Sequence, residues 1–190
     1  MSRSPHSDDT PPMVLYAGRH LHLLRTTSGW EYAHRPQARG IVAVLALTDD
    51  RRVLLTEQYR PPVRARVIEL PAGLAGDIPL MEDEPLVTAA RRELREETGY
   101  TAREFIKLMS GPSSAGMSTE IITLFQATGL TKVGEGGGDG SENIRVHAIP
   151  VRELRAWCRE REEEGLLVDF KIHAALQLAV ETAGGRRLWQ

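Results

Sequence analysis

Three glutamates recur at helical spacing in residues 92–99, which read RELREETG. Glu93 and Glu97 are four residues apart and Glu93 and Glu96 are three apart, so a helix would project all three carboxylates to one side. Like charges at this spacing repel and mildly destabilise a helix. A Mg²⁺ ion would remove the repulsion, because this hard cation binds carboxylate oxygens together with substrate phosphates. The alternative is a solvated helix face on which glutamates and arginines alternate, as most charge runs do.

The residues around the glutamates predict the helix that would carry them. Residues 84–98 contain no glycine, and their one proline, Pro85, stands in the first turn, where a helix tolerates it. Four apolar residues form a stripe at helical spacing: Leu86, Ala89, Ala90 and Leu94. Gly99 is a natural C-terminal stop.

The rest of the chain alternates between strand-like and helix-like segments. Residues 40–48 are a nearly continuous apolar run, typical of a strand buried on both faces. Further strands are expected at 14–27, 30–34, 52–59, 66–70, 105–109, 121–127 and 144–149, and helices at 151–164 and 169–183. A loop should run from Pro71 to about Asp83, and the glycine-rich segment 134–140 should be a mobile loop. A mixed sheet with a few helices indicates an α/β or α+β fold.

Length, charge and cysteine content limit the classes of protein. With 190 residues, 41% of them hydrophobic, the chain can form one domain with a substantial core, expected over residues 13–190 behind a flexible tail at 1–12. A net charge of −2 argues against a nucleic-acid partner, which would require a basic footprint. Cys158 is the only cysteine, which excludes an intramolecular disulfide and a Cys-based zinc site and fits a reducing cytoplasm. No apolar run of 18 residues occurs, so no membrane association is expected.

Residues 84–100 resemble the Nudix box, Gly-x5-Glu-x7-Arg-Glu-U-x-Glu-Glu-x-Gly-U, where U is an aliphatic residue. Residues 92–99 match every fixed position, and Glu84 stands at the correct distance before them. The box's first glycine would fall at Ile78; Gly73 is its best counterpart, so the loop before the helix is five residues longer than in the family. The last position is Tyr100, which still presents an apolar body.

This resemblance implies an α/β/α sandwich with a loop–helix–loop metal site. Glu93 and Glu97 would bind Mg²⁺, for which Mn²⁺ is a possible substitute, and Glu96 would help directly or through water. Glu84 and Arg92 would form a structural pair that braces the loop against the helix. Gly73 and Gly99 would be the structural glycines of the box.

Four further segments resemble the ADP-ribose pyrophosphatase branch of this family: QYRPP at 58–62, IELPAG at 68–73, SAGMSTE at 114–120 and ENIRVH at 142–147. The branch implies a metal contact from the carbonyl of Ala72 and a catalytic base at Glu142, with Glu120 as the competing acid. The proline that marks ADP-ribose enzymes is expected at position 115, where this chain has alanine. Related nucleotide sugars such as GDP-mannose are therefore alternative candidate substrates.

Three more residues are candidates for substrate binding. Trp30, in the N-terminal β-hairpin arm, could stack on the base, or it could be a core or interface residue. Arg60 and Arg35 are possible phosphate clamps because a guanidinium donates bidentate hydrogen bonds, although an exposed surface role suits Arg35 better. The arm would help form a homodimer. A non-catalytic ligand sensor would keep the fold and lose the carboxylates, all of which are present here.

Overall fold

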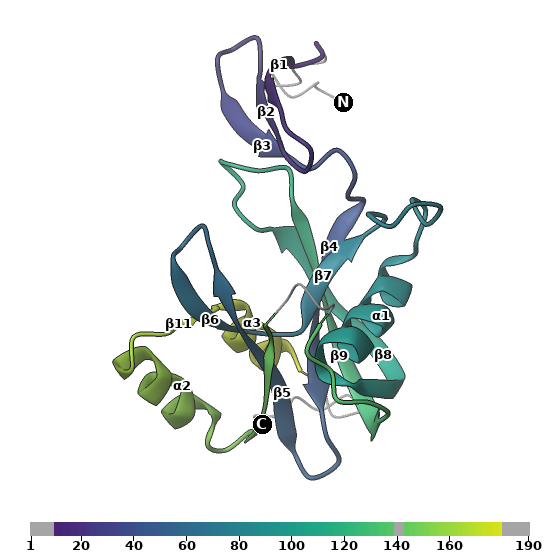
Figure 1. Ribbon diagram of the computed structural model, residues 1–190, viewed down its shortest axis with the longest axis vertical. Coiled ribbons are helices and arrows are strands. Elements are labelled where there is room, and N and C mark those ends of the chain that lie inside the picture. The colour runs from purple at the N-terminus through teal and green to yellow at the C-terminus, as the bar shows by residue number, and fades with distance from the viewer. Residues whose placement is uncertain (1–9, 139–142, 180–190) are drawn as a thin grey trace, which may run out of the picture.

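The N-terminal arm forms a small sheet of its own. The computed structural model describes residues 10–138 and 143–179, so most of the expected tail lies outside the described residues. Strands β1 (Met13–Ala17), β2 (His22–Arg25) and β3 (Glu31–His34) pair antiparallel in that order. Figure 1 shows this sheet at one end of the molecule, beyond the main sheet.

The main sheet is mixed and is built around one central strand. Its strands are β4 (Gly40–Leu47), β5 (Arg52–Arg60), β6 (Ala65–Glu69), β7 (Ala72–Ala75), β8 (Tyr100–Pro112), β9 (Ile121–Lys132), β10 (Arg145–Pro150) and β11 (Leu167–Val168). The order is β11-β6-β5-β4-β9-β8, with β10 paired to β5 and β7 paired to β4. The β4–β9 and β11–β6 pairs are parallel and the others antiparallel. Residues 42–46 of β4 are fully buried, as their continuous apolar run predicts.

Three helices in the described ranges cover the two faces of this sheet (Figure 1). Helix α1 (Leu86–Thr98) packs its apolar stripe against one face, where Val44 and Leu54 lie in the same cluster as Leu94. Helices α2 (Leu154–Glu163) and α3 (Lys171–Leu178) cover the other face in a second cluster. Because side chains alternate along a strand, Leu54 faces α1 while Leu55 faces α2 and α3. The expected α/β/α sandwich is confirmed.

Several element boundaries differ from the sequence expectations. The segment 14–27 is two strands, because the chain turns where Gly18 N–H donates to the Leu21 carbonyl at 2.9 Å. Strands β8 and β9 are longer than expected because they pair along their whole length. Part of the expected loop after Pro71 is strand β7, which pairs with residues 40–43 of β4. The expected end of the last helix at 183 lies outside the described residues.

The arm is attached to the main body through residues 113–120, which connect β8 to β9. Ala33 N–H donates to the Met117 carbonyl at 2.8 Å, and Thr119 N–H donates to the Ala33 carbonyl at 3.1 Å. His34 Nδ1 lies 2.9 Å from Thr119 Oγ1. These contacts fix the arm next to the connection that carries Glu120.

Candidate active site

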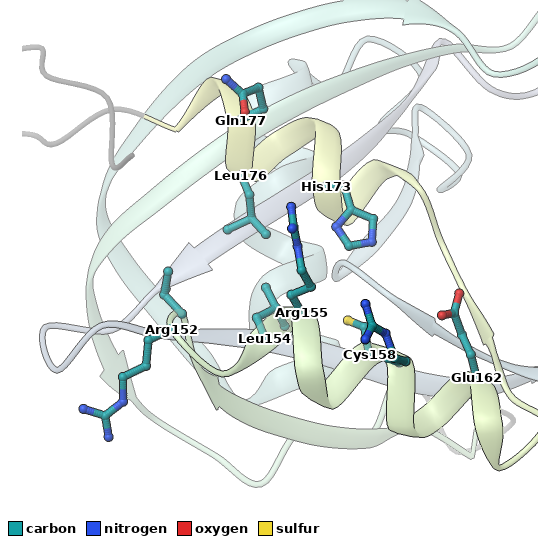
Figure 2. A pocket seen from close by; sticks show the side chains of 10 residues that line it. Arg152, Leu154, Arg155, Cys158, Glu162, His173, Leu176 and Gln177 are labelled. Atoms are coloured by element: carbon teal, nitrogen blue, oxygen red, sulfur yellow. The ribbon is translucent and has the colours of Figure 1, made fainter. Parts of the chain in front are cut away.

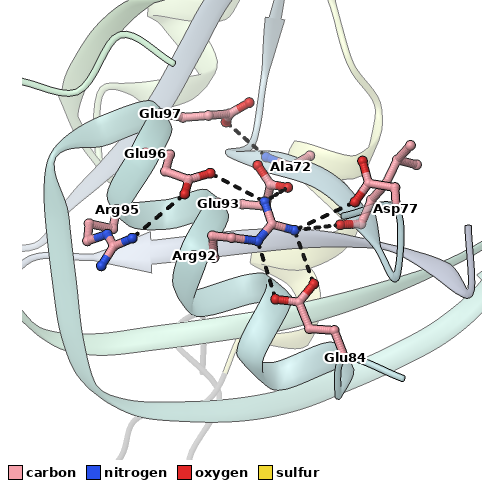
Figure 3. Close-up of polar contacts among 9 residues, drawn as sticks. Ala72, Asp77, Glu84, Arg92, Glu93, Arg95, Glu96 and Glu97 are labelled. Atoms are coloured by element: carbon pink, nitrogen blue, oxygen red, sulfur yellow. Dashed lines mark hydrogen bonds and ion pairs between the residues drawn. The ribbon is translucent and has the colours of Figure 1, made fainter. Parts of the chain in front are cut away.

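The guanidinium of Arg92 joins α1 to the loop that precedes it. Its Nε and Nη2 atoms donate to the two carboxylate oxygens of Glu84 at 3.3 and 3.2 Å, and Nη2 also donates to the Leu74 carbonyl at 2.8 Å. The Glu84 side chain is fully buried. Figure 3 shows this fork, in which one largely buried cation links the helix, the loop and strand β7. A bidentate arginine–carboxylate pair fixes geometry as well as charge.

The same guanidinium reaches two of the box glutamates. Its Nη1 donates to Glu93 Oε1 at 2.7 Å and to Glu96 Oε2 at 3.3 Å, and Asp77 lies 3.9 Å from Nη2. Burial disfavours the charged form of Arg92, but the hydrogen bonds and charges of Glu84 and Glu93 outweigh burial and raise its pKa. Arg92 therefore stays charged and holds the carboxylates around it.

Glu93 is a largely buried carboxylate that lies directly against the backbone at Gly73. Burial raises the pKa of Glu93 to about 7; the charge and hydrogen bond of Arg92 oppose this, while the charges of Glu96 and Asp77 add to it. A Cβ atom on Gly73 would lie 2.0 Å from Glu93 Oε1. A side chain at position 73 would therefore displace this carboxylate from its present position.

Glu97 is anchored to strand β7. Its Oε2 accepts a hydrogen bond from the Ala72 N–H at 3.0 Å, and the residue is only 3% exposed. Ala72 itself is held in register opposite Ala43 of the central strand. Figure 3 shows Glu93, Glu96 and Glu97 on the side of α1 that faces Ala72, as their helical spacing predicts.

The donor set suits a hard divalent cation. Among residues 10–138 and 143–179, no three His, Cys, Asp or Glu side chains group closely enough to hold a metal ion. The reason is visible in the hydrogen bonds: Arg92 draws Glu93 and Glu96, and the Ala72 N–H holds Glu97. Three carboxylates on one helix face nevertheless form an oxygen donor set that Mg²⁺ prefers. A cation would compete with Arg92 for Glu93 and Glu96. It would also offset the free-energy cost of burying the negative charge of Glu93.

The glycine-rich segment is fixed to the C-terminal end of α1. The N–H groups of Gly137 and Gly138 donate to the carbonyls of Glu97 at 2.8 Å and Glu96 at 3.0 Å, two of the carbonyls that a helix end leaves unpaired. A Cβ atom on Gly136 would lie 2.4 Å from the carbonyl carbon of Thr98. The described part of the segment is therefore hydrogen-bonded to the helix, and its expected mobility stays a prediction. Glu142, the candidate base, lies outside the described residues.

Glu120 is not brought together with the box glutamates. Its Oε1 atom pairs with Arg35 Nε at 2.6 Å, and its Oε2 accepts a hydrogen bond from Ser113 at 3.1 Å. Ala43 of β4 pairs with Ala72 of β7 on one side and with Leu124 of β9 on the other. Glu120 precedes Leu124 by four residues. That register separates Glu120 from Ala72 by about 13 Å along the strand, at ~3.3 Å a residue. Arg35 and Glu120 neutralise each other, which weakens both as candidates.

Arg60 and Trp30 have different surroundings. Arg60 lies on the same sheet face as α1, because it follows Leu54 at even spacing along β5. Its Nε atom donates to Glu69 Oε2 at 2.7 Å, which orients the guanidinium.

Trp30 is 62% exposed, so it is not a core residue, and its indole N–H donates to the Gly116 carbonyl at 2.9 Å. The exposed ring suits stacking on a ligand or on a partner.

Two residues near the site were not identified from the sequence. Glu69 lies in the IELPAG segment, but only the pairing of β5 with β6 shows that it orients Arg60. Asp77 lies in the longer loop and adds negative charge next to Arg92 and Glu93. No spacing rule connects Asp77 to the helix, because its position depends on the path of the loop.

The comparisons with known proteins agree with this geometry. The model of the NUDIX domain matches residues 37–170. A Bacillus methanolicus protein named methanol dehydrogenase activator is 35% identical over 152 residues, which are 80% of this chain and 76% of the relative. The ADP-ribose pyrophosphatase of Bacillus subtilis (strain 168) is 38% identical over 139 residues, 73% of this chain and 70% of the relative. The protein belongs to the Nudix family, as the box residues indicate.

A solved structure supports the fold as well. The crystal structure of an ADP compounds hydrolase matches with a TM-score of 0.64 at 19% sequence identity and covers 89% of this chain and 92% of that chain. None of the three helices in the described ranges has both the length and the apolar character that crossing a membrane requires.

The contact between Gly73 and Glu93 gives a first test of the site. We expect Gly73→Ala to displace the Glu93 carboxylate, because the new Cβ would lie 2.0 Å from Oε1. Displacing a group that orients or forms a metal site typically lowers metal affinity by about 10–100-fold. Mn²⁺ titration by calorimetry measures the loss. Gly111→Ala is the matched control, since its nearest neighbour would be Met109 Cε at 3.6 Å. Equal Mn²⁺ affinity in both variants would contradict the assignment.

The attachment of the glycine-rich segment to α1 gives a second test. Gly136 and Gly137 both have positive φ angles, of 72° and 107°, but only Gly136 meets backbone atoms where a Cβ would stand. Alanine at either position costs roughly 1–3 kcal/mol of backbone strain. We expect Gly136→Ala to lower the free energy of unfolding by at least about 1 kcal/mol more than Gly137→Ala, because the segment must also separate from the helix. Urea denaturation compares the two, and equal losses would mean that the contact is not tight.

Proposed function

We propose that the protein is a Mg²⁺-dependent pyrophosphohydrolase that cleaves the diphosphate of ADP-ribose or a related nucleoside diphosphate sugar. The products would be a nucleoside monophosphate and a sugar phosphate. The observation that carries this proposal is the set of three glutamates on one face of α1, of which Glu97 is buried and Glu93 largely buried against β7. The similarity to an ADP-ribose pyrophosphatase over 73% of the chain supports the substrate class.

Each candidate residue has a distinct role in this proposal. Glu93, Glu96, Glu97 and the Ala72 carbonyl would hold Mg²⁺, or Mn²⁺ in its place. The bound ions would neutralise the diphosphate and activate the attacking water. Arg60, oriented by Glu69 on the same sheet face, would donate to a phosphate oxygen.

Residues outside the box would act as the catalytic base and bind the nucleobase of the substrate. Glu142 would accept the proton of the water as it attacks phosphorus in line with the leaving group. Trp30 would stack on the nucleobase with the exposed face of its indole ring. Most of the rate enhancement would come from positioning and from electrostatic stabilisation of the phosphoryl group.

We also propose that the arm contributes to a homodimer. The arm exposes several large apolar side chains, namely Met13, Val14, Tyr16 and Trp30, each more than half exposed. Exposed apolar surface of this kind is typical of interaction sites. A partner bound to the arm would also lie near residues 113–120, because the arm is hydrogen-bonded to them.

Hydrolysis of nucleotide sugars tests the proposed function directly. With Mg²⁺ we expect release of AMP from ADP-ribose and turnover of at least one other nucleoside diphosphate sugar, since alanine stands at position 115. EDTA should abolish both activities. Glu97→Gln should lower the rate by orders of magnitude, whereas Glu163→Gln, an exposed residue of α2, should not change it. Inertness towards ADP-ribose together with rapid hydrolysis of nucleoside triphosphates would contradict the proposal.

The two candidate bases can be separated by their kinetics. A general base contributes ~10²–10⁴-fold to the rate, so we expect Glu142→Gln to lower kcat by about that factor and to leave KM nearly unchanged. Glu120→Gln should have a much smaller effect on kcat, because Glu120 is paired with Arg35. Steady-state assays of the two variants at several pH values make the comparison. If Glu120→Gln lowered kcat strongly and Glu142→Gln left it unchanged, Glu120 would be the base instead of Glu142.

A further inference from the structure

A groove between α2 and α3 lies on the face of the sheet opposite the box glutamates. Its volume is about 850 Å³, within the range of small-molecule sites. Leu154 and Leu176 on its floor belong to the core cluster beneath α2 and α3, whereas α1 packs on the other cluster. Figure 2 shows the side chains of Arg155, His173 and Leu176 in this groove. The groove therefore has no part in the site on α1.

The wall of the groove that α2 supplies is strongly cationic. Arg155 and Arg159 line it and are four residues apart, so they project to one side of the helix, where like charges repel, and Arg152 lines it from the turn before the helix. Arg152 is paired with Glu153 at 3.0 Å. Arg155 and Arg159, in contrast, form no ion pair with any described residue. Arg161, which does not line the groove, pairs with Glu164 at 2.7 Å.

The floor of the groove is apolar. Leu154, Leu176 and Cys158 line it and are all buried. Burial and the charge of Glu162 raise the pKa of the Cys158 thiol to about 11, so at neutral pH this side chain is a small neutral group. On the α3 side, His173 and Gln177 add polar atoms to the wall. The groove thus combines an apolar surface with two guanidinium groups that have no ion-pair partner among the residues described.

We propose that this groove binds a phosphorylated small molecule with an apolar or aromatic body. Arg155 and Arg159 would bind the phosphate, because two guanidinium groups supply enough donors for a dianion and match its oxygens bidentately. The body of the ligand would cover Leu154 and Leu176. Glu162 lines the groove beyond Arg159 in the helix and repels an anion, so the phosphate lies towards Arg155.

Phenyl phosphate is the probe that contains both halves of the proposed ligand. We expect it to shift the methyl NMR signals of Leu154 and Leu176 in the full-length protein, with and without Mg²⁺, and to leave those of Leu94 under α1 unchanged. Inorganic phosphate and phenol, which each contain one half, should bind more weakly. Shifts confined to Leu94, or no shifts at millimolar phenyl phosphate, would overturn the proposal.

Charge-neutral variants test the role of the two arginines. Arg155→Gln and Arg159→Gln should each weaken phenyl phosphate binding by about tenfold, the effect of losing a charge-assisted hydrogen bond. Arg103→Gln on β8 is the matched control, because it removes the same charge from an exposed residue outside the groove. It should bind like the unaltered protein. If Arg103→Gln weakened phenyl phosphate binding equally, the effect would come from the net charge of the protein and not from the groove. If binding were unchanged in both groove variants, Arg155 and Arg159 would not bind the phosphate.

Discussion

The largely buried guanidinium of Arg92, with its hydrogen bonds, is the interaction on which the rest of the site depends. A charge inside a protein is tolerated only when it is paired and hydrogen-bonded, and Arg92 meets this condition with Glu84, Glu93 and the Leu74 carbonyl at once. These three partners come from the loop, the helix and strand β7. Removing any of them would leave a charge or a carbonyl without its partner in a low-dielectric environment. Arg92 therefore ties the loop to the helix, even though the loop is five residues longer than the family pattern.

This arrangement also explains how the fold accommodates the three carboxylates without a bound cation. Arg92 partly neutralises Glu93 and Glu96, while Glu97 is held by the Ala72 N–H. The helix end is supported by Gly137 and Gly138, whose N–H groups bind the carbonyls of the two glutamates nearest it. Repulsion among three acids on one face is thus balanced by local partners, and an ion would replace interactions that already exist.

Local patterns in the sequence are sufficient for the helix and the central strand. The apolar stripe ending at Leu94 predicts which side of α1 is buried, and Glu93 and Glu97 lie along that same side because they are three residues beyond Ala90 and Leu94. Features that depend on pairing between distant segments could not be predicted. Strand β7 was expected as a loop because only its ladder with β4 makes it a strand. The glycine-rich segment was expected to be mobile because its composition does not reveal the helix end that it binds.

The departure from the family pattern at position 115 has a structural counterpart in the arm. A proline there would restrict the backbone locally by fixing its φ angle. In this chain the same connection is restricted by hydrogen bonds: the Met117 carbonyl accepts from Ala33, the Gly116 carbonyl accepts from Trp30, and the Thr119 N–H donates to Ala33. Three hydrogen bonds thus tie this connection to the arm, whereas a proline would fix a single φ angle. Because Trp30 both orders this connection and exposes its ring, the conformation of residues 113–120 and the orientation of the indole are coupled.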